Sequence, residues 1–117
     1  MAYLVYRSTD TTVVDLLAGA AIDGTWGDSG KLSCLITSIV IAASAASTVD
    51  LRLETSATTS ADRYIFDGLI MSAGTTLTMD TPIEFDRSTA DLVLELGSSS
   101  DDVTIFIRYQ ETRKINR

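Results

Sequence analysis

The sequence has no histidine, a single cysteine and a single proline among its 117 residues. Because histidine is missing, the chain lacks the commonest general base and the commonest neutral metal ligand, and no Ser, His and Asp or Cys and His catalytic arrangement can form. Cys34 cannot make a disulfide within the chain, and its position in an apolar stretch predicts a buried, unreactive thiol. No glycine-rich phosphate-binding loop is present either. We therefore expect a protein that is not an enzyme and that uses no cofactor.

Long apolar runs are also missing. The most apolar stretch begins at Leu32, but serine and threonine interrupt it and it ends at Asp50. A membrane-spanning helix needs about 20 mainly apolar residues, so this stretch is too polar to be one. The N-terminus lacks the basic segment and apolar core of a secretory signal. We expect no membrane association and assembly in a cytoplasm.

Positive charge is scarce and unevenly distributed in a chain of net charge −7. Residues 108–117 nevertheless have a balance of +3, because they contain Arg108, Arg113, Lys114 and Arg117 against Glu111. That leaves −10 on residues 1–107, and such an acidic body disfavours non-specific binding to nucleic acid. Residues 111–117 are predicted to be a basic tail that either docks on an acidic neighbour, such as another copy of this body, or stays solvated.

The clearest pattern lies in residues 32–54. Both alternating sets of residues 32–43 are largely apolar, which predicts a strand buried on both faces. One set contains Leu35, Ile39 and Ile41, and the other contains Ile36, Val40 and Ala42. After a small-residue turn, an apolar and a charged set alternate as Val49, Leu51 and Leu53 against Asp50, Arg52 and Glu54. This period of two predicts a second strand with one buried and one solvent-facing side.

The rest of the chain consists of short alternating stretches separated by turn residues. The candidates for further strands are residues 62–71, 77–79, 82–85, 92–96 and 103–109. Turns at intervals of roughly 8 to 12 residues between such stretches are typical of all-β sandwiches and barrels. We therefore predict one all-β domain over residues 32–110, an antiparallel β-sandwich of jelly-roll type.

Residues 1–31 lack such a pattern and are predicted to form an irregular N-terminal arm and loop. Residues 2–7 alternate weakly and suit either a first strand or an extended arm. Leu16 and Leu17 follow in a segment that fits a short helical turn as well as a strand, and Trp26 is the one large side chain of a glycine-rich loop. A tryptophan in such a loop usually packs on its own domain or into a partner.

A group of carboxylates surrounds the single proline. Asp80, Glu84 and Asp86 offer the oxygen ligands that calcium prefers, but their spacing is not that of an EF-hand. Paired carboxylates also catalyse glycoside hydrolysis. An acidic chain produces such groups by chance, however, and charges usually cover a surface. We expect a solvated turn here, with a calcium site and a catalytic pair as the alternatives.

Three stretches of the sequence resemble a known group of proteins. They are LITSIVIAASAASTVDLRLE, DRYIFDGLIMSAGTTLTMDTPIEFD and LVLELGSSSDDVTIFIR, and they lie within residues 32–108. Their strand and turn motifs resemble those of small all-β virion proteins of tailed bacteriophages. Such proteins look like capsid cement (decoration) proteins or like head-to-tail and tail components.

The resemblance implies a structural subunit of a virion that is assembled in the host cytoplasm. Capsid cement is the first expectation, and a neck or tail component is the second. The implied partners are the major capsid protein, or neck and tail proteins, and further copies of this chain in a homo-oligomer, with a trimer on a local threefold as one arrangement. The expected contact residues are Leu16, Leu17, Trp26, Arg108, Arg113, Lys114 and Arg117.

A carbohydrate- or calcium-binding β-sandwich module is the alternative from another class of function. Aromatic side chains exposed beside residues 80–86 would favour this alternative, whereas buried ones would count against it.

Overall fold

The computed structural model describes residues 2–17, 32–55, 62–87 and 90–113. Within these ranges the chain forms β-strands and no helix, which confirms the all-β prediction, and no helix able to cross a membrane occurs in them. The strands are β1 (Ala2–Ser8), β2 (Val14–Asp15), β3 (Leu32–Ala43), β4 (Ser47–Thr55), β5 (Arg63–Met71), β6 (Thr76–Met79), β7 (Ile83–Asp86), β8 (Ala90–Leu96) and β9 (Val103–Arg113). All the strands expected after residue 31 are present.

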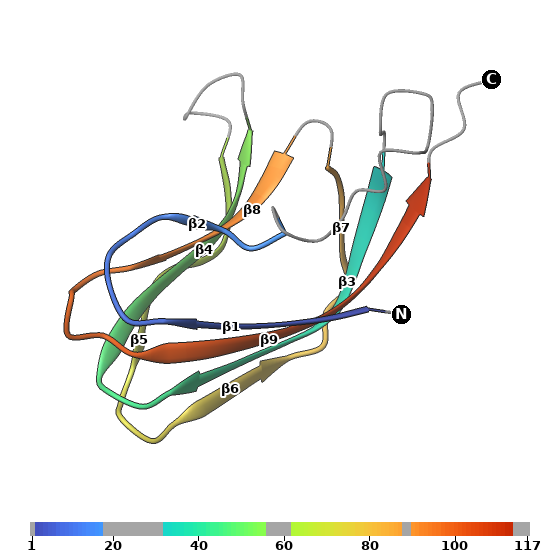
Figure 1. The fold of residues 1–117 in the computed structure, drawn as a ribbon. Coiled ribbons are helices and arrows are strands. Elements are labelled where there is room, and N and C mark those ends of the chain that lie inside the picture. The colour runs from blue at the N-terminus through green and yellow to red at the C-terminus, as the bar shows by residue number, and fades with distance from the viewer. Residues whose placement is uncertain (1, 18–31, 56–61, 88–89, 114–117) are drawn as a thin grey trace.

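The strands form two antiparallel sheets. Sheet 1 has the order β1-β9-β3, and β6 and β7 pair with different parts of β3. Sheet 2 has the order β2-β8-β4-β5. Figure 1 shows β9 (red) between β1 (blue) and β3 (cyan), so the last strand of the chain is central in sheet 1.

A β-bulge in β3 decides which of its side chains face the core. The register between β3 and β9 shifts directly after Ile36, and the Thr37 hydroxyl donates a hydrogen bond of 3.3 Å to the Arg108 carbonyl. The extra residue turns Ile36 and Ile39 to the same side although they are three positions apart, and both are buried. The strict alternation expected for this strand, which grouped Leu35 with Ile39, is therefore wrong before the bulge.

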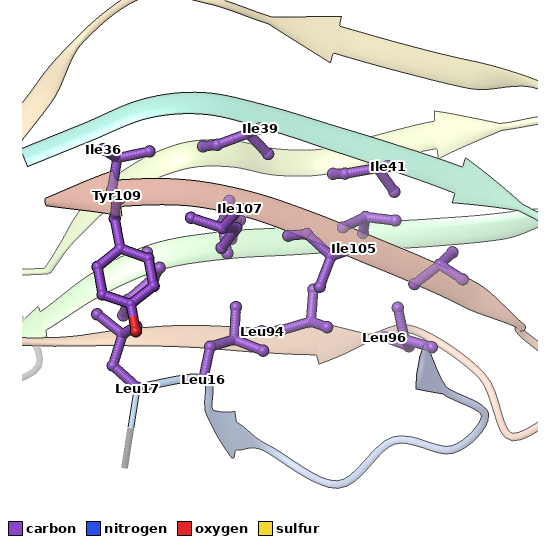
Figure 2. Packing of buried hydrophobic residues seen from close by; sticks show 14 of the residues in the cluster. Leu16, Leu17, Ile36, Ile39, Ile41, Leu94, Leu96, Ile105, Ile107 and Tyr109 are labelled. Carbon is purple, nitrogen blue, oxygen red and sulfur yellow. The ribbon is translucent and has the colours of Figure 1, made fainter. Parts of the chain in front are cut away.

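The hydrophobic core lies between the two sheets. Figure 2 shows isoleucines of β3 and β9 pointing toward leucines of β8. The largest fully buried side chains are Leu17, Ile36, Ile39, Ile41, Val49, Leu51, Leu92, Leu94, Leu96, Val103, Ile105 and Ile107. Burying each of these stabilises the fold by about 1.5 to 3 kcal/mol before the entropy of ordering the chain is subtracted.

The N-terminal residues, expected to form an irregular arm, contribute one strand to each sheet, and Leu16 and Leu17 follow the second of these strands in a turn. β1 pairs with β9, and β2 pairs with β8. The Leu16 amide donates to the Leu92 carbonyl at 2.9 Å, and the Leu17 amide donates to the Asp15 carboxylate at 3.2 Å. The Leu16 and Leu17 side chains are 4% and 1% exposed and pack in the core (Figure 2). Trp26 and the rest of residues 18–31 lie outside the described ranges.

The turn before β9 is hydrogen-bonded to the start of β4. The buried Asp101 carboxylate accepts hydrogen bonds from the Thr48 amide at 3.2 Å and from the Ser98 amide at 3.1 Å. The Ser47 hydroxyl accepts a further hydrogen bond from the Asp102 amide at 3.1 Å. These side chains satisfy backbone groups that no strand partner reaches, and they connect sheet 1 to sheet 2 at this end.

The turn between β5 and β6 depends on a glycine. Gly74 has a φ of 80°, in the left-handed region that other residues enter only with strain. Its amide donates to the Ala43 carbonyl at 2.7 Å, and the Ala43 amide donates to the Thr75 carbonyl at 2.9 Å. The turn is thereby joined to the end of β3.

Candidate interaction surface

The outer face of sheet 1 exposes a group of apolar side chains. Because alternate residues of β1 and β9 enter the core, the residues between them point outward. Val5 pairs with Phe106, and Phe106 pairs with Val40 on the other side of β9, so the three form a row across three strands. We call Tyr3, Val5, Val40, Phe106 and Arg108 the sheet-1 patch. The exposed fractions of Tyr3, Val5 and Phe106 are 69%, 60% and 42%, which is high for side chains of this size.

Arg108 provides the positive charge of the sheet-1 patch. It pairs with Tyr3 across β1 and β9, and its guanidinium carbon lies 5.1 Å from the centre of the Tyr3 ring. This distance is within the range of a cation–π interaction. A hollow of about 240 Å³ opens between these side chains and those of Ser38, Val40 and Phe106. The patch can therefore accept a small apolar projection from a partner while offering a guanidinium at its rim.

A groove runs along the same side of the molecule between the edge strands β1 and β2. Its volume is about 390 Å³. Its lining is mainly apolar and aromatic and consists of Tyr3, Leu4, Tyr6, Val14, Asp15, Leu16 and Tyr109. Tyr3 belongs to both features, so the β1–β2 groove and the sheet-1 patch form one continuous surface around β1.

An ion pair anchors the C-terminal end of β1. The exposed Arg7 guanidinium donates two hydrogen bonds to the Asp102 carboxylate, from Nε at 3.0 Å and from Nη2 at 2.7 Å. The hydrogen bond from Arg7 holds the pKa of Asp102 below its usual value. The only charge on β1 is thus neutralised within the chain.

The outer face of sheet 2 differs in that several carboxylates surround a single buried arginine, although its edge strand β5 also exposes Tyr64 and Ile70. Arg52 lies in it with only 8% of its surface exposed. Its Nη1 is 3.0 Å from Glu95 Oε1 and its Nη2 is 3.0 Å from Glu54 Oε2. Its Nε is 3.7 Å from Asp62 Oδ2, and its guanidinium lies 6.0 Å from the centre of the Tyr64 ring. Burial alone would lower the pKa of Arg52, but the hydrogen bonds to the two glutamates outweigh burial and raise it.

This face carries further negative charge besides the carboxylates that Arg52 contacts. The buried Oδ1 of Asp62 has no hydrogen-bond partner among the described residues. The pKa of Asp91 is raised by partial burial and then by the negative charges of Asp15 and Glu54. We call Asp15, Glu54, Asp62, Asp91 and Glu95 the sheet-2 acidic cluster.

Cys34 is buried in the core, which confirms the expectation of a buried thiol. Burial is the main cause that raises the pKa of Cys34 to about 12, and the Glu111 carboxylate adds to it while Arg87 opposes it. Arg87 Nη1 is 2.6 Å from Glu111 Oε2, and its Nη2 donates to the Leu17 carbonyl at 2.6 Å. This arginine links the end of β2 to β9 and has a structural role.

The carboxylates around Pro82 are not organised as a site. The described residues contain no group of three Asp, Glu, Cys or His side chains placed to hold a metal ion. Phe85, which lies on β7 between Glu84 and Asp86, is buried with 8% of its surface exposed. Burial of the aromatic ring beside these carboxylates counts against the carbohydrate- or calcium-binding alternative.

The structure separates the residues that the sequence singled out as contacts. Arg108 lies in the sheet-1 patch, whereas Leu16 and Leu17 are buried in the core and expose too little surface to anchor a partner. β9 extends to Arg113, which lies opposite Leu32 on β3, so the expected basic tail begins as strand. Lys114, Arg117 and Trp26 lie outside the described ranges.

Sequence reasoning did not select the three exposed apolar residues of the patch. Tyr3, Val5 and Phe106 each occupy the outward position of an alternating stretch, which was the available signal. Only the pairing of β1 with β9 makes them neighbours.

In comparisons with known proteins, the chain matches no family model, no curated protein and no solved structure.

Proposed function

We propose that the chain is a non-enzymatic structural subunit of a tailed-phage virion, assembled in the host cytoplasm. In this proposal it is a capsid cement (decoration) protein that stabilises the head through contacts with the major capsid protein and with its own copies. The sequence resemblance within residues 32–108 supports this assignment. A neck or tail component is the second candidate, since the same resemblance extends to head-to-tail and tail proteins.

The finer architecture that we propose is a jelly-roll sandwich. If β6 and β7 are counted as one interrupted strand, eight strands pair first with last: β1 with β9, β2 with β8, β3 with β6 and β7, and β4 with β5. This is the pairing of one long hairpin. When the hairpin is folded over, β9 also meets β3 and β8 also meets β4, which gives two sheets. Jelly rolls occur in viral capsid proteins as well as lectins, so the architecture supports the proposal by analogy.

The sheet-1 patch is the observation that carries the proposal. Exposed aromatic and aliphatic side chains beside an arginine have the composition of a protein–protein interface core. They lie on the face of a sheet, a shape that suits another protein surface. The outer face of sheet 2 instead presents the sheet-2 acidic cluster, which favours hydration. We therefore assign the contact with the particle to the outer face of sheet 1.

Co-sedimentation tests the proposal. The full chain would be incubated with separately purified heads and tails of the encoding phage, and the same would be done for the variants Phe106→Ser and Ile70→Ser. Ile70 is the matched control because it is an apolar residue, 82% exposed, on the edge strand β5 and outside the patch. We expect the unaltered chain and Ile70→Ser to sediment with heads and Phe106→Ser to stay in solution.

The outcomes of this experiment distinguish binding to heads, binding to tails and no binding to the particle. Sedimentation with tails alone selects the neck or tail candidate, and electron microscopy then gives the copy number. If the unaltered chain sediments with neither heads nor tails, the virion proposal is wrong. If Phe106→Ser binds as well as Ile70→Ser does, the contact does not lie on the sheet-1 patch.

A further inference from the structure

The edges of the two sheets differ in how well they are protected against pairing with another strand. Unpaired N–H and C=O groups on an edge are a template for a further strand, and natural sheets block them with short strands, proline, charges or bulges. β2 has two residues, and β6 and β7 have four each with Pro82 between them. β5 has two register shifts against β4 and contains Gly68 at a φ of 65°. Three of the edges formed by the described strands are therefore blocked.

The edge formed by β1 has none of these features. Its seven residues pair with β9 in an unbroken register and include neither proline nor glycine. No described strand lies on its other side. The Arg7 charge is neutralised by Asp102 of the same chain, while Tyr3 and Val5 expose most of their surface. Among the described strands, β1 is therefore the edge without a blocking feature.

We infer that β1 is a self-association edge, at which two copies of the chain pair their β1 strands antiparallel about a twofold axis at Val5. The two copies of sheet 1 then form one continuous sheet, and the sheet-1 patches lie side by side on one face. Such an isologous contact closes at the dimer. The inference concerns the free chain and does not depend on the proposed role in a virion.

The residues of β1 are complementary to themselves in this register. An axis at Val5 places Tyr3 opposite Arg7 of the second copy, and Leu4 opposite Tyr6 of the second copy. An arginine beside a tyrosine ring is favourable. Like charges that face each other destabilise a strand pair, and this register brings none together. Leu4 and Tyr6 line the β1–β2 groove, so the same pairing brings apolar side chains of the second copy to the open groove.

The distribution of charge also favours this edge as the contact between copies. With a net charge of −7, two copies repel each other on average. β1 and residues 103–110 of β9 contain Arg7 and Arg108 and no carboxylate. The outer face of sheet 2, in contrast, carries the sheet-2 acidic cluster. Two copies therefore meet with less repulsion along β1 than across the outer face of sheet 2, and a second copy is the occupant that we assign to this edge.

Charge substitutions at Val5 provide the experiment, because the axis places this residue opposite itself. Sedimentation equilibrium would be measured on the full chain, on Val5→Lys, on Val5→Glu and on an equimolar mixture of these two variants. We expect the unaltered chain to be a dimer, each variant alone to be a monomer through repulsion between like charges, and the mixture to form the dimer again. Ile70→Lys, which places the same charge on the protected edge β5, should remain a dimer.

A disulfide crosslink tests the register independently. Under oxidising conditions Val5→Cys should form a covalent dimer, whereas Tyr3→Cys should not, because its counterpart is Arg7 of the second copy. Circular dichroism confirms that each variant is folded. A monomeric unaltered chain, a trimer, or a dimer that survives Val5→Lys would each overturn the inference.

Discussion

Replacement of Arg52 by methionine tests whether the charge on the outer face of sheet 2 is needed for stability. Methionine retains an apolar stem at this position, which pairs with Tyr64 across β4 and β5, and removes the guanidinium. The Glu54 and Glu95 side chains are 39% and 36% exposed, so water can replace most of the hydrogen bonding that Arg52 gives them. The loss of each of these two ion pairs should therefore cost only about 0.5 kcal/mol. The Asp62 side chain is only 9% exposed, so water can do little to replace its contact with the Arg52 guanidinium.

The cost of the substitution follows from these exposures. A buried polar group without a partner costs about 1 to 3 kcal/mol. Among the described residues, Asp62 would lose the cation that its contact with Arg52 supplies and would still lack a hydrogen bond at Oδ1. Together with the two glutamates this predicts that Arg52→Met lowers the free energy of unfolding by about 3 kcal/mol, near the lower limit for breaking a buried ion pair. A second substitution, Asp62→Asn, removes the unpaired charge and should restore about 1 to 2 kcal/mol.

Urea unfolding followed by circular dichroism at neutral pH measures these differences. Arg7→Met is the matched control, because it removes the exposed ion pair with Asp102 and should change stability much less. The reasoning fails if Arg52→Met destabilises the protein no more than Arg7→Met does. It also fails if the double variant is as unstable as Arg52→Met, since the loss would then not come from Asp62.

Further predictions concern a turn, a thiol and a carboxylate. Gly74→Ala should lower stability in urea melts by about 1 to 2 kcal/mol, because a Cβ there meets no atom within 4 Å and the cost is that of the left-handed backbone alone; Gly74→Asn should cost less, and equal losses would contradict this cause. Cys34, with a pKa raised to about 12, should react with a disulfide reagent at pH 8 on the order of 10³-fold more slowly when folded than in urea; similar rates would show that the thiol is accessible. Because the pKa of Asp91 is raised on folding, its ionisation removes stability as the pH rises above the unfolded value of 3.8. Asp91→Asn should therefore stabilise the protein at pH 7, by less than about 0.5 kcal/mol for so exposed a group, and have no such effect below about pH 3.

The sequence predicts the strands well and the side-chain environments less well, because the latter depend on distant partners. The alternation after Val49 correctly indicates that Leu51 faces the core and that Arg52 faces outward. An outward position suggests a solvated side chain, yet Arg52 is buried by Glu95 and Asp62 from other parts of the chain. No pattern among neighbouring residues of the sequence predicts these contacts of Arg52 with Glu95 and Asp62.

The same limit explains three other features that the sequence did not predict. The bulge after Ile36 is a property of the register with β9 and leaves no mark in a stretch where both alternating sets are apolar. Leu16 and Leu17 looked like part of an arm because β2 is only two residues long, too short for a period to be recognised. The candidate surface was predicted only through Arg108, since the pairing of β1 with β9 is needed to place Tyr3 beside it.

The central position of β9 sets the order in which the protein can fold. This strand pairs with the whole of β1, from Ala2 opposite Tyr109 to Ser8 opposite Val103, and with almost the whole of β3. Sheet 1 cannot close during synthesis until residues 103–113 have left the ribosome. Until then β1 lacks the strand with which it pairs, and β3 lacks the strand with which it pairs over most of its length. Pairings between residues so far apart in sequence are slow to form, typically in milliseconds to seconds. A nascent chain of this protein is therefore most prone to aggregate just before β9 emerges.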